Sequence, residues 1–274
     1  MDYLFDAWGA VKGKLKDKYL FIFLDFDGTL APIAQTPKEA ALSERARGIL
    51  KALSGDPRLS IAFISGRGLE DIKNKIALKD IIYAGNHGLE IEGPKIKFRP
   101  LVPGRYRAVI ERIKNDLEQR LALFKGVFVE DKGLILSLHY RLADKIKIPQ
   151  IKTIFHETII SYLVKGRIKI KPGKMVLEVG PPTEWDKGKV VLWLLARQQF
   201  GLEKKEILPI YIGDDLSDED AFKALRKKGL TIFVGSRRDY SARYYLKDSQ
   251  QVVEFLNRIL EARYAGINGS KKAF

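Results

Sequence analysis

Short runs of consecutive apolar residues recur along the chain, and each run ends at a polar or glycine-containing motif. They cover residues 19–24, 59–64, 81–84, 207–212 and 230–234. Because these runs are continuous rather than alternating, they predict strands that are buried on both faces, as in a parallel sheet. Helical spacing of apolar residues separates several of them, at residues 46–53, 190–195 and 221–225. The pattern therefore predicts an α/β fold with a doubly wound parallel-sheet core.

The N-terminal stretch has a different pattern. Residues 3–15 place apolar side chains at helical spacing, which predicts a short amphipathic helix before the first strand. The longest apolar run, residues 19–24, is too short to cross a bilayer. We therefore expect neither a signal peptide nor a membrane span, and a cytoplasmic location.

The middle of the chain predicts an insertion into this core. Two helical patterns, at residues 109–121 and 151–159, alternate with strand-like stretches that turn at Asp-Lys-Gly and Pro-Gly-Lys. This is an α+β pattern between the third and fourth core strands. The predicted organisation is a first part of the core at residues 1–103, an inserted α+β cap domain at 104–181, and a second part of the core at 182–274. Val102-Pro103-Gly104 and Gly180-Pro181-Pro182 are the predicted hinges.

The period of two along the inserted strands assigns their faces. One face is apolar and is predicted to pack on the two helices: Leu134, Leu136, Leu138, Tyr140, Met175, Leu177 and Val179. The other face is mostly polar: Ser137, His139, Arg141, Lys174, Val176 and Glu178. A polar sheet face above the strand ends is a candidate lid over a site.

The net charge and the cysteine content limit the classes of binding partner and of chemistry that are possible. Lysine and arginine number 49 against 34 aspartates and glutamates, a formal net charge of +15, which suits a nucleic acid, a membrane surface or a phosphorylated small molecule. The basic residues are scattered, without an arginine-rich arm or zinc-finger spacing, so we predict neither a nucleic-acid nor a membrane partner. The absence of cysteine excludes disulfides and thiolate chemistry.

The candidate chemistry begins in "FIFLDFDGTLAP", where Asp25 and Asp27 follow a predicted buried strand. Both carboxylates can point into the crevice at the strand end, and Gly28 with Thr29 permits a tight turn. Asp25 is a candidate nucleophile that forms an aspartyl-phosphate, with Asp27 as the general acid and base. A carboxylate that attacks an anionic phosphoryl group needs a cation, and oxygen ligands favour Mg²⁺.

A second strand end supplies further carboxylates. In "YIGDDLSDED", Asp214, Asp215 and Asp218 follow the run at 207–212, so a shared cation would relieve their repulsion. The same residues also fit a turn and a helix cap, with Ser217 or Asp218 capping a helix that begins near Glu219.

Donors for phosphoryl oxygens follow other strands. Ser65 and the backbone amides of Gly66 and Arg67 lie after the second strand, and Lys187 begins a helix in "WDKG". Taken alone, each motif also has an ordinary structural interpretation, and a solvated lysine is the simplest one for Lys187. We interpret the three histidines as hydrogen-bonded structural residues rather than metal ligands: His87, His139 and His156.

With these motifs in order, the chain resembles the haloacid dehalogenase (HAD) superfamily of phosphohydrolases and, within it, the trehalose-6-phosphate phosphatases. The resemblance rests on these stretches: "DFDGTLAPI", "SGR", "GNHGLE", "LSLHYR", "KMVLEV", "WDKG", "YIGDDLSDEDAF" and "YYLKDSQQVVEFL". It implies a HAD-like core and a phosphoric monoester hydrolase.

The resemblance also implies roles for individual residues. Asp25 would be the nucleophile, and Mg²⁺ would be held by the Asp25 carboxylate, the Asp27 carbonyl and Asp214. Phosphate would be bound by Ser65, Gly66, Arg67 and Lys187. Sugar hydroxyls would be bound by the residues Glu130, Lys132, Arg141, Lys174 and Glu178. Supporting positions are Thr29, Asn86, His87, Asp215 and Asp218. Gly180 departs from the family pattern, which has a basic residue there, so contacts at that edge of the sugar pocket are in question.

The sequence thus predicts a Mg²⁺-dependent phosphatase that acts on a small-molecule sugar phosphate, trehalose 6-phosphate first. Phosphatases for sucrose phosphate or mannosyl-3-phosphoglycerate are the alternatives within enzymes. A non-catalytic sugar-phosphate sensor is the alternative outside enzymes, and intact Asp25, Asp27, Lys187 and Asp214 argue against it. Association with a trehalose-phosphate synthase is left open.

Overall fold

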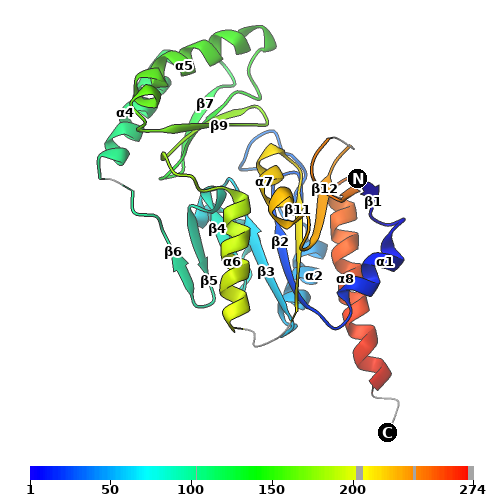
Figure 1. The fold of residues 1–274 in the computed structure, drawn as a ribbon. Coiled ribbons are helices and arrows are strands. Elements are labelled where there is room, and N and C mark those ends of the chain that lie inside the picture. The colour runs from blue at the N-terminus through cyan, green and yellow to red at the C-terminus, as the bar shows by residue number, and fades with distance from the viewer. Residues whose placement is uncertain (103, 202–205, 237–238, 271–274) are drawn as a thin grey trace.

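The computed structural model describes residues 1–102, 104–201, 206–236 and 239–270. Figure 1 shows a large sheet with helices on both of its faces and, above one end of it, a smaller sheet covered by two helices. The predicted α/β core with an α+β insertion is confirmed. Pro103, one of the predicted hinge residues, lies outside the described residues.

Nine strands form the large sheet within the described chain. In spatial order they are β1 (Asp2–Tyr3), β13 (Tyr244–Leu246), β12 (Leu230–Val234), β11 (Ile207–Gly213), β2 (Tyr19–Leu24), β3 (Leu59–Ile64), β4 (Ile82–Gly85), β5 (Glu90–Gly93) and β6 (Ile96–Phe98). The neighbours from β1 to β4 pair in parallel, and β5 and β6 continue the edge in antiparallel pairing. All five predicted apolar runs are strands, to within one residue at either end.

Helices cover both faces of this sheet and explain the continuous apolar runs. They are α1 (Trp8–Leu15), α2 (Glu44–Ser54), α3 (Leu69–Ile76), α6 (Lys187–Gly201), α7 (Glu219–Leu225) and α8 (Ser249–Ser270). In β2, Leu20, Ile22 and Leu24 belong to the core beneath α1, α2, α3 and α8. Phe21 and Phe23 belong to the opposite core, with residues of α6 and α7. Successive side chains of β2 therefore enter two different apolar layers.

The predicted N-terminal helix is too long at its start. The helix α1 begins at Trp8, and Asp2–Tyr3 instead forms a short strand at the sheet edge. The backbone N–H of Asp2 donates to Arg243 O at 3.0 Å, and that of Leu4 donates to Tyr245 O at 3.1 Å. Pairing with β13 satisfies these backbone groups, while the Leu4 side chain is fully buried.

The inserted segment, which runs between β6 and α6, contains the smaller antiparallel sheet. Its elements are α4 (Gly104–Leu121), β7 (Phe128–Asp131), β8 (Leu136–His139), α5 (Ile148–Val164), β9 (Lys169–Gly173) and β10 (Val176–Gly180), with the strands in the order β7-β8-β10-β9. The predicted apolar face is confirmed for Leu136, Leu138, Tyr140, Leu177 and Val179, which form one core with residues of α4 and α5.

Met175 was wrongly placed on that apolar face. It lies in the turn between β9 and β10, has a left-handed φ of 63° and is 36% exposed. The strand period does not apply inside the turn.

The strands β5 and β6 were not predicted. They are short and half polar, so their residues give no continuous apolar run. Among the described residues, none of the helices is both long enough and apolar enough to span a membrane.

Gly88 offers a test of the packing between the strand ends and α6. Its φ is +91°, and a Cβ there would lie 2.0 Å from Val190 Cγ2. We expect Gly88→Ala to lower the free energy of unfolding by about 2 kcal/mol or more, from backbone strain and overpacking together. Urea unfolding monitored by circular dichroism measures this loss.

Gly48→Ala is the matched control. Gly48 lies in α2, with no atom within 4 Å of an added Cβ. Its replacement should raise the free energy of unfolding by roughly 0.5–1 kcal/mol through helix propensity. Equal effects of the two substitutions would contradict the close contact at Gly88.

Candidate active site

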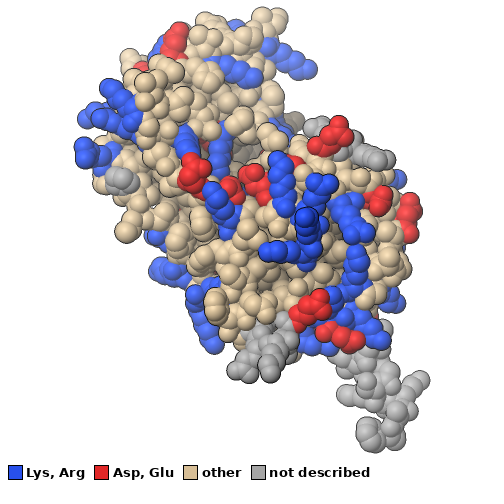
Figure 2. Space-filling model, in the orientation of Figure 1, with Lys and Arg blue, Asp and Glu red and all other residues tan. Residues whose placement is uncertain are grey.

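The predicted motifs meet at the carboxyl-terminal edge of the large sheet. Asp25 follows β2, Ser65 follows β3, and Asp214 follows β11. The polar face of the smaller sheet lies opposite, and the two enclose a cleft of about 340 Å³. Figure 2 shows acidic and basic side chains gathered along the hollow between the two parts of the molecule. Most of the predicted site residues line this cleft, whereas Thr29, Asn86 and Asp218 lie buried behind it.

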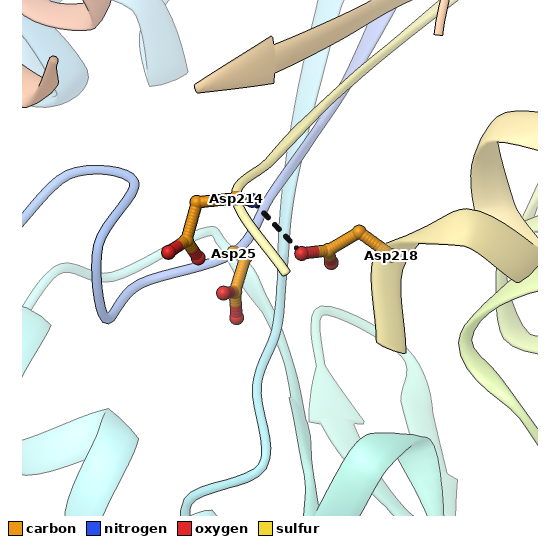
Figure 3. A group of neighbouring side chains, drawn as sticks. All are labelled: Asp25, Asp214 and Asp218. Carbon is orange, nitrogen blue, oxygen red and sulfur yellow. Dashed lines mark hydrogen bonds between the residues drawn. The ribbon is translucent and has the colours of Figure 1, made fainter. Parts of the chain in front are cut away.

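Three buried carboxylates form the centre of the site. Asp25, Asp214 and Asp218 each place one oxygen within 4.8 Å of the others (Figure 3). Burial raises the pKa of Asp25 well above its usual value, and it raises that of Asp214 to about 7, with the neighbouring acids adding to both shifts. Because Asp25 and Asp214 resist ionisation here, a divalent cation bound between them would stabilise their charged forms.

Asp218 holds this group together rather than facing the cleft. Its Oδ2 accepts from the backbone N–H of Asp214 at 2.9 Å and of Asp215 at 3.0 Å. Its Oδ1 accepts from Tyr211 Oη and Lys187 Nζ, both at 2.7 Å. These four bonds use the acceptor capacity of the carboxylate, which leaves Asp25 and Asp214 as the acids with oxygens to offer a metal.

The loop after β11 also serves as the helix cap that the sequence left open. Asp215 accepts from Ser217 N at 2.7 Å and forms a capping box with Asp218 at the start of the short helix η3 (Leu216–Asp218). The predicted helix α7 does begin at Glu219 with Asp218 at its N-cap position, but the Asp218 side chain makes no capping bond to it, and the side-chain cap is that of Asp215 on η3. The loop therefore serves both as a helix cap and as part of the acidic group, because it caps η3 and also presents Asp214 to the cleft.

Lys187 supplies the positive charge within the acidic group. At the start of α6, its ammonium is 2% exposed and lies 2.7 Å from Asp218 Oδ1 and 3.2 Å from Asp25 Oδ1. Burial alone would lower the pKa of Lys187, but the two aspartates outweigh it and hold that pKa well above its usual value. Lys187 is therefore a charged, buried lysine rather than a solvated one.

The turn after Asp25 passes directly over Asp214. Gly28 has a φ of +83°, and a Cβ there would lie 2.0 Å from Asp214 Oδ2. Thr29 Oγ1 lies 3.5 Å from Asp214 Oδ1. Glycine at position 28 is thus required for the turn after β2 to approach Asp214 this closely.

Asp27 and Arg67 pair with each other in the structure. The Arg67 guanidinium donates to both carboxylate oxygens of Asp27, each at 2.7 Å. It also donates to Asp71 Oδ2 at 2.6 Å and to Pro37 O at 2.8 Å. The sequence interpretation missed Asp71, which lies in the first turn of α3, because Arg67 precedes that helix and helical spacing does not apply to the pair. Ser65 Oγ accepts from the Arg67 backbone N–H at 3.2 Å, so this loop is held in place.

A strained turn follows β4. In the short helix η1 (Asn86–Gly88), Asn86 and His87 have φ values of 51° and 57°, which are uncommon for residues with side chains. The Asn86 amide donates to Glu90 Oε2 at 2.9 Å and to Lys132 O at 3.1 Å. His87 Nε2 lies 2.6 Å from Glu178 Oε2. The turn therefore connects the core loops to the inserted segment.

Glu178 is the centre of that connection. Besides His87, it accepts from Lys132 Nζ and from Ser137 Oγ, each at 2.9 Å. Burial would raise its pKa, but Lys132 and His87 together hold it well below the usual value. Lys132 also donates to Gly66 O at 3.0 Å, so one lysine joins the inserted sheet to the loop after β3.

The other predicted sugar-binding residues surround the cleft. Glu130 Oε2 lies 2.8 Å from His139 Nε2, and the His139 ring stacks on Phe128 at a centroid distance of 4.5 Å. Lys174, in the turn after β9, donates to Asp214 O at 2.9 Å and contacts the Asp214 carboxylate. Arg141 donates to Lys174 O at 2.9 Å. His156 is exposed on α5 and does not line the cleft.

Two further positions bear on this edge of the cleft. A Cβ at Gly180 would meet Ile135 Cγ1 at 3.7 Å, an ordinary contact, so the backbone there leaves room for a side chain. Lys171 lines the cleft and was not predicted. The predicted turn at Pro-Gly-Lys gave no signal for it, because the register that places Lys171 opposite Glu178 has its turn at Lys174 and Met175.

Comparison with known proteins agrees with this geometry. The sequence model of the trehalose-phosphatase family, described as "Trehalose-phosphatase", matches residues 23–250. Trehalose-phosphate phosphatase B of Arabidopsis thaliana is 34% identical over 261 residues, which cover 90% of this chain and 67% of that protein. Probable trehalose-phosphate phosphatase 4 of Oryza sativa is 34% identical over 265 residues, covering 92% and 68%.

Solved structures show the same fold. The C-terminal domain of C. albicans trehalose-6-phosphate phosphatase has a TM-score of 0.80 at 24% identity, covering 92% of this chain and 96% of that one. A haloacid dehalogenase-like hydrolase from Bacteroides thetaiotaomicron has a TM-score of 0.61 at 19% identity, covering 88% and 100%. With its HAD-like fold and the family match over most of its length, the chain belongs to the trehalose-phosphatase family of phosphoric monoester hydrolases.

Proposed function

We propose that the protein hydrolyses trehalose 6-phosphate to trehalose and phosphate, with Mg²⁺ as cofactor. The observation that carries the proposal is the buried pair of Asp25 and Lys187, with Asp214 alongside, facing the polar sheet of the inserted segment. The family match and the names of the relatives support the choice of sugar.

In the first half of the reaction, an Asp25 carboxylate oxygen attacks phosphorus and the bond to the sugar oxygen breaks. Asp27 donates its proton to that oxygen, which leaves trehalose and an aspartyl-phosphate on Asp25. Lys187, at the start of α6, lies where it can neutralise a phosphoryl oxygen. Mg²⁺, held by Asp25, the Asp27 carbonyl and Asp214, would supply further charge neutralisation when bound.

In the second half, Asp27 takes a proton from the water that attacks phosphorus. The bond between phosphorus and the Asp25 oxygen breaks, which releases phosphate and restores the carboxylate. Arg67 donates to both Asp27 oxygens, which holds the carboxylate in position for this proton transfer. The proposed donors to phosphate are the Ser65 hydroxyl and the backbone amides of Gly66 and Arg67. The Arg67 side chain could bind phosphate as well only by rotating away from Asp27 towards the ligand.

The inserted segment, residues 104–181, is the proposed cap that selects the sugar. Its proposed hydroxyl-binding residues all line the cleft: Glu130, Lys132, Arg141, Lys174 and Glu178. Charged donors and acceptors suit a disaccharide, because buried polar groups left unpaired by a wrong ligand are costly. The cytoplasmic location and the absence of a nucleic-acid partner stay predictions from the sequence.

A panel of phosphate esters with and without Mg²⁺ tests the function. Phosphate release should be fastest from trehalose 6-phosphate and should fall to background when Mg²⁺ is removed with EDTA and return when it is restored. The panel includes sucrose 6-phosphate and mannosyl-3-phosphoglycerate. Release from either of these, with none from trehalose 6-phosphate, would transfer the assignment to that sugar; release from no ester would favour the sensor.

Asp25→Asn tests the nucleophile. The turnover number kcat should fall by at least about 10⁴-fold, because the amide cannot form the phosphorylated intermediate. The fold should survive, since the amide removes a buried charge that Asp214 and Asp218 oppose. Asp56→Asn, before β3 at the opposite edge of the sheet, is the control and should keep wild-type turnover. Near-normal turnover in Asp25→Asn would overturn the assignment.

Glu178→Gln tests the connection between the inserted segment and the core through pH. Because the folded pKa of Glu178 is lowered, its contribution to stability is complete above the unfolded pKa of about 4.3 and is lost as pH falls through the folded pKa. The wild type should therefore lose more unfolding free energy than the variant between about pH 5 and pH 3. Urea unfolding over this range measures the difference.

The variant should be less stable than the wild type at pH 7, because Lys132 loses its ion pair with Glu178 at 2.9 Å and keeps only the longer one with Glu130 at 3.9 Å within the described chain. Glu157→Gln provides a surface control on α5, where an ion pair with Arg120 is exposed and should matter little. Parallel pH curves for the wild type and Glu178→Gln would show that Glu178 is not held ionised by its neighbours.

A further inference from the structure

Lys171 is a basic residue of the cleft to which the mechanism above gives no role. It lies in β9, directly opposite Glu178 of β10 in the antiparallel register. Directly opposed residues project from the same face of a sheet, so Lys171 shares the face that Glu178 presents to the core. Lys171, Glu178 and Lys187 all line the cleft. The side chain therefore stands between the inserted sheet and the start of α6.

The Lys171 ammonium has spare donors. Within the part of the chain that the structure describes, its one hydrogen bond goes to Trp185 O at 3.4 Å, and it forms no ion pair. The other lysines of the cleft differ. Lys132 and Lys187 each lie within 3 Å of a carboxylate oxygen, and Lys174 contacts the Asp214 carboxylate. Lys171 is thus the cleft lysine whose donors are left for a ligand.

Its surroundings favour a ligand rich in oxygen. Lys171 is half-buried, and burial lowers its pKa, with Lys187 adding to this, while the more distant acids Asp186, Glu178 and Asp220 oppose the shift. A partly desolvated ammonium without a close partner is stabilised by any acceptor that reaches it.

We propose that Lys171 is a specificity-determining residue whose ammonium donates hydrogen bonds to hydroxyl oxygens of the sugar. The inference rests on the proposed function, since it assumes a sugar phosphate in this cleft. A sugar contact is favoured over a phosphate contact by position. Lys171 belongs to the inserted sheet with Glu178, whereas the proposed phosphate donors Ser65 and Lys187 belong to the strand ends and α6 of the core.

Lys171→Met tests the assignment, because methionine keeps most of the apolar stem and removes the charge. The KM for trehalose 6-phosphate should rise about tenfold or more, as expected for a lost hydrogen bond from a charged group, with kcat changed less than about threefold. For p-nitrophenyl phosphate, which has no sugar, kcat/KM should stay within about twofold of the wild type. Lys171→Arg, which keeps the charge, should recover most of the affinity.

Lys169→Met is the matched control. Lys169 lies on the same strand and face, opposite Gly180, but it pairs with Glu184 and does not line the cleft. Its replacement should leave both substrates unaffected. An unchanged KM for the sugar phosphate in Lys171→Met, or an equal loss on both substrates, would overturn the sugar contact; the second result would mark a phosphate contact instead.

The wild-type assay separates this inference from the proposed function. If the wild type hydrolyses another sugar phosphate and not trehalose 6-phosphate, the proposed substrate is wrong, and the same variants are compared on the ester that is hydrolysed. A selective rise of KM there would still support Lys171 as a sugar contact. If the wild type hydrolyses trehalose 6-phosphate and Lys171→Met does not alter its KM, only the role of Lys171 fails.

Discussion

The repulsion among buried carboxylates at the ends of β2 and β11 is the constraint on which the site depends. Asp25, Asp214 and Asp218 lie close together with little access to water, and burial and the neighbouring acids disfavour the ionisation of Asp25 and Asp214. The fold tolerates this because Lys187 lies among them and because Asp218 accepts four hydrogen bonds. Those bonds fix the loop after β11, and with it the position of Asp214 beside Asp25.

The contact between the inserted segment and the core also depends on a buried charge that its neighbours compensate. Glu178 accepts from two side chains of the inserted sheet and bonds to His87 of the core, whose backbone is held in a left-handed conformation. Removing one partner would leave a buried charge uncompensated, which costs more than the pair contributes. The proposed sugar pocket is therefore also a structural contact, and we expect substitutions there to affect stability and specificity together.

The core was predictable because its signals are local and repeated. Continuous apolar runs marked β2, β3 and β12 to the residue, since both faces of these strands are buried. The edge strands β5 and β6 gave no such signal, because their pairing compensates for half-polar sequences. Met175 was misassigned for a related reason: strand periodicity fails at a turn, and the residue where a hairpin reverses depends on the backbone conformation.

Sequence by itself determined the fold class, the order of the motifs and their common position at the carboxyl ends of parallel strands. Those features follow from residue spacing and from the geometry of parallel sheets. Only the tertiary structure decided which charges pair. Arg67 is bonded to Asp27, and Lys187 lies within 3.2 Å of both Asp25 and Asp218. Lys171 alone among the cleft lysines lacks a close carboxylate in the described chain. The reason is physical: ion pairs between residues far apart in sequence depend on distances of a few ångströms and on burial, and neither is set by local spacing.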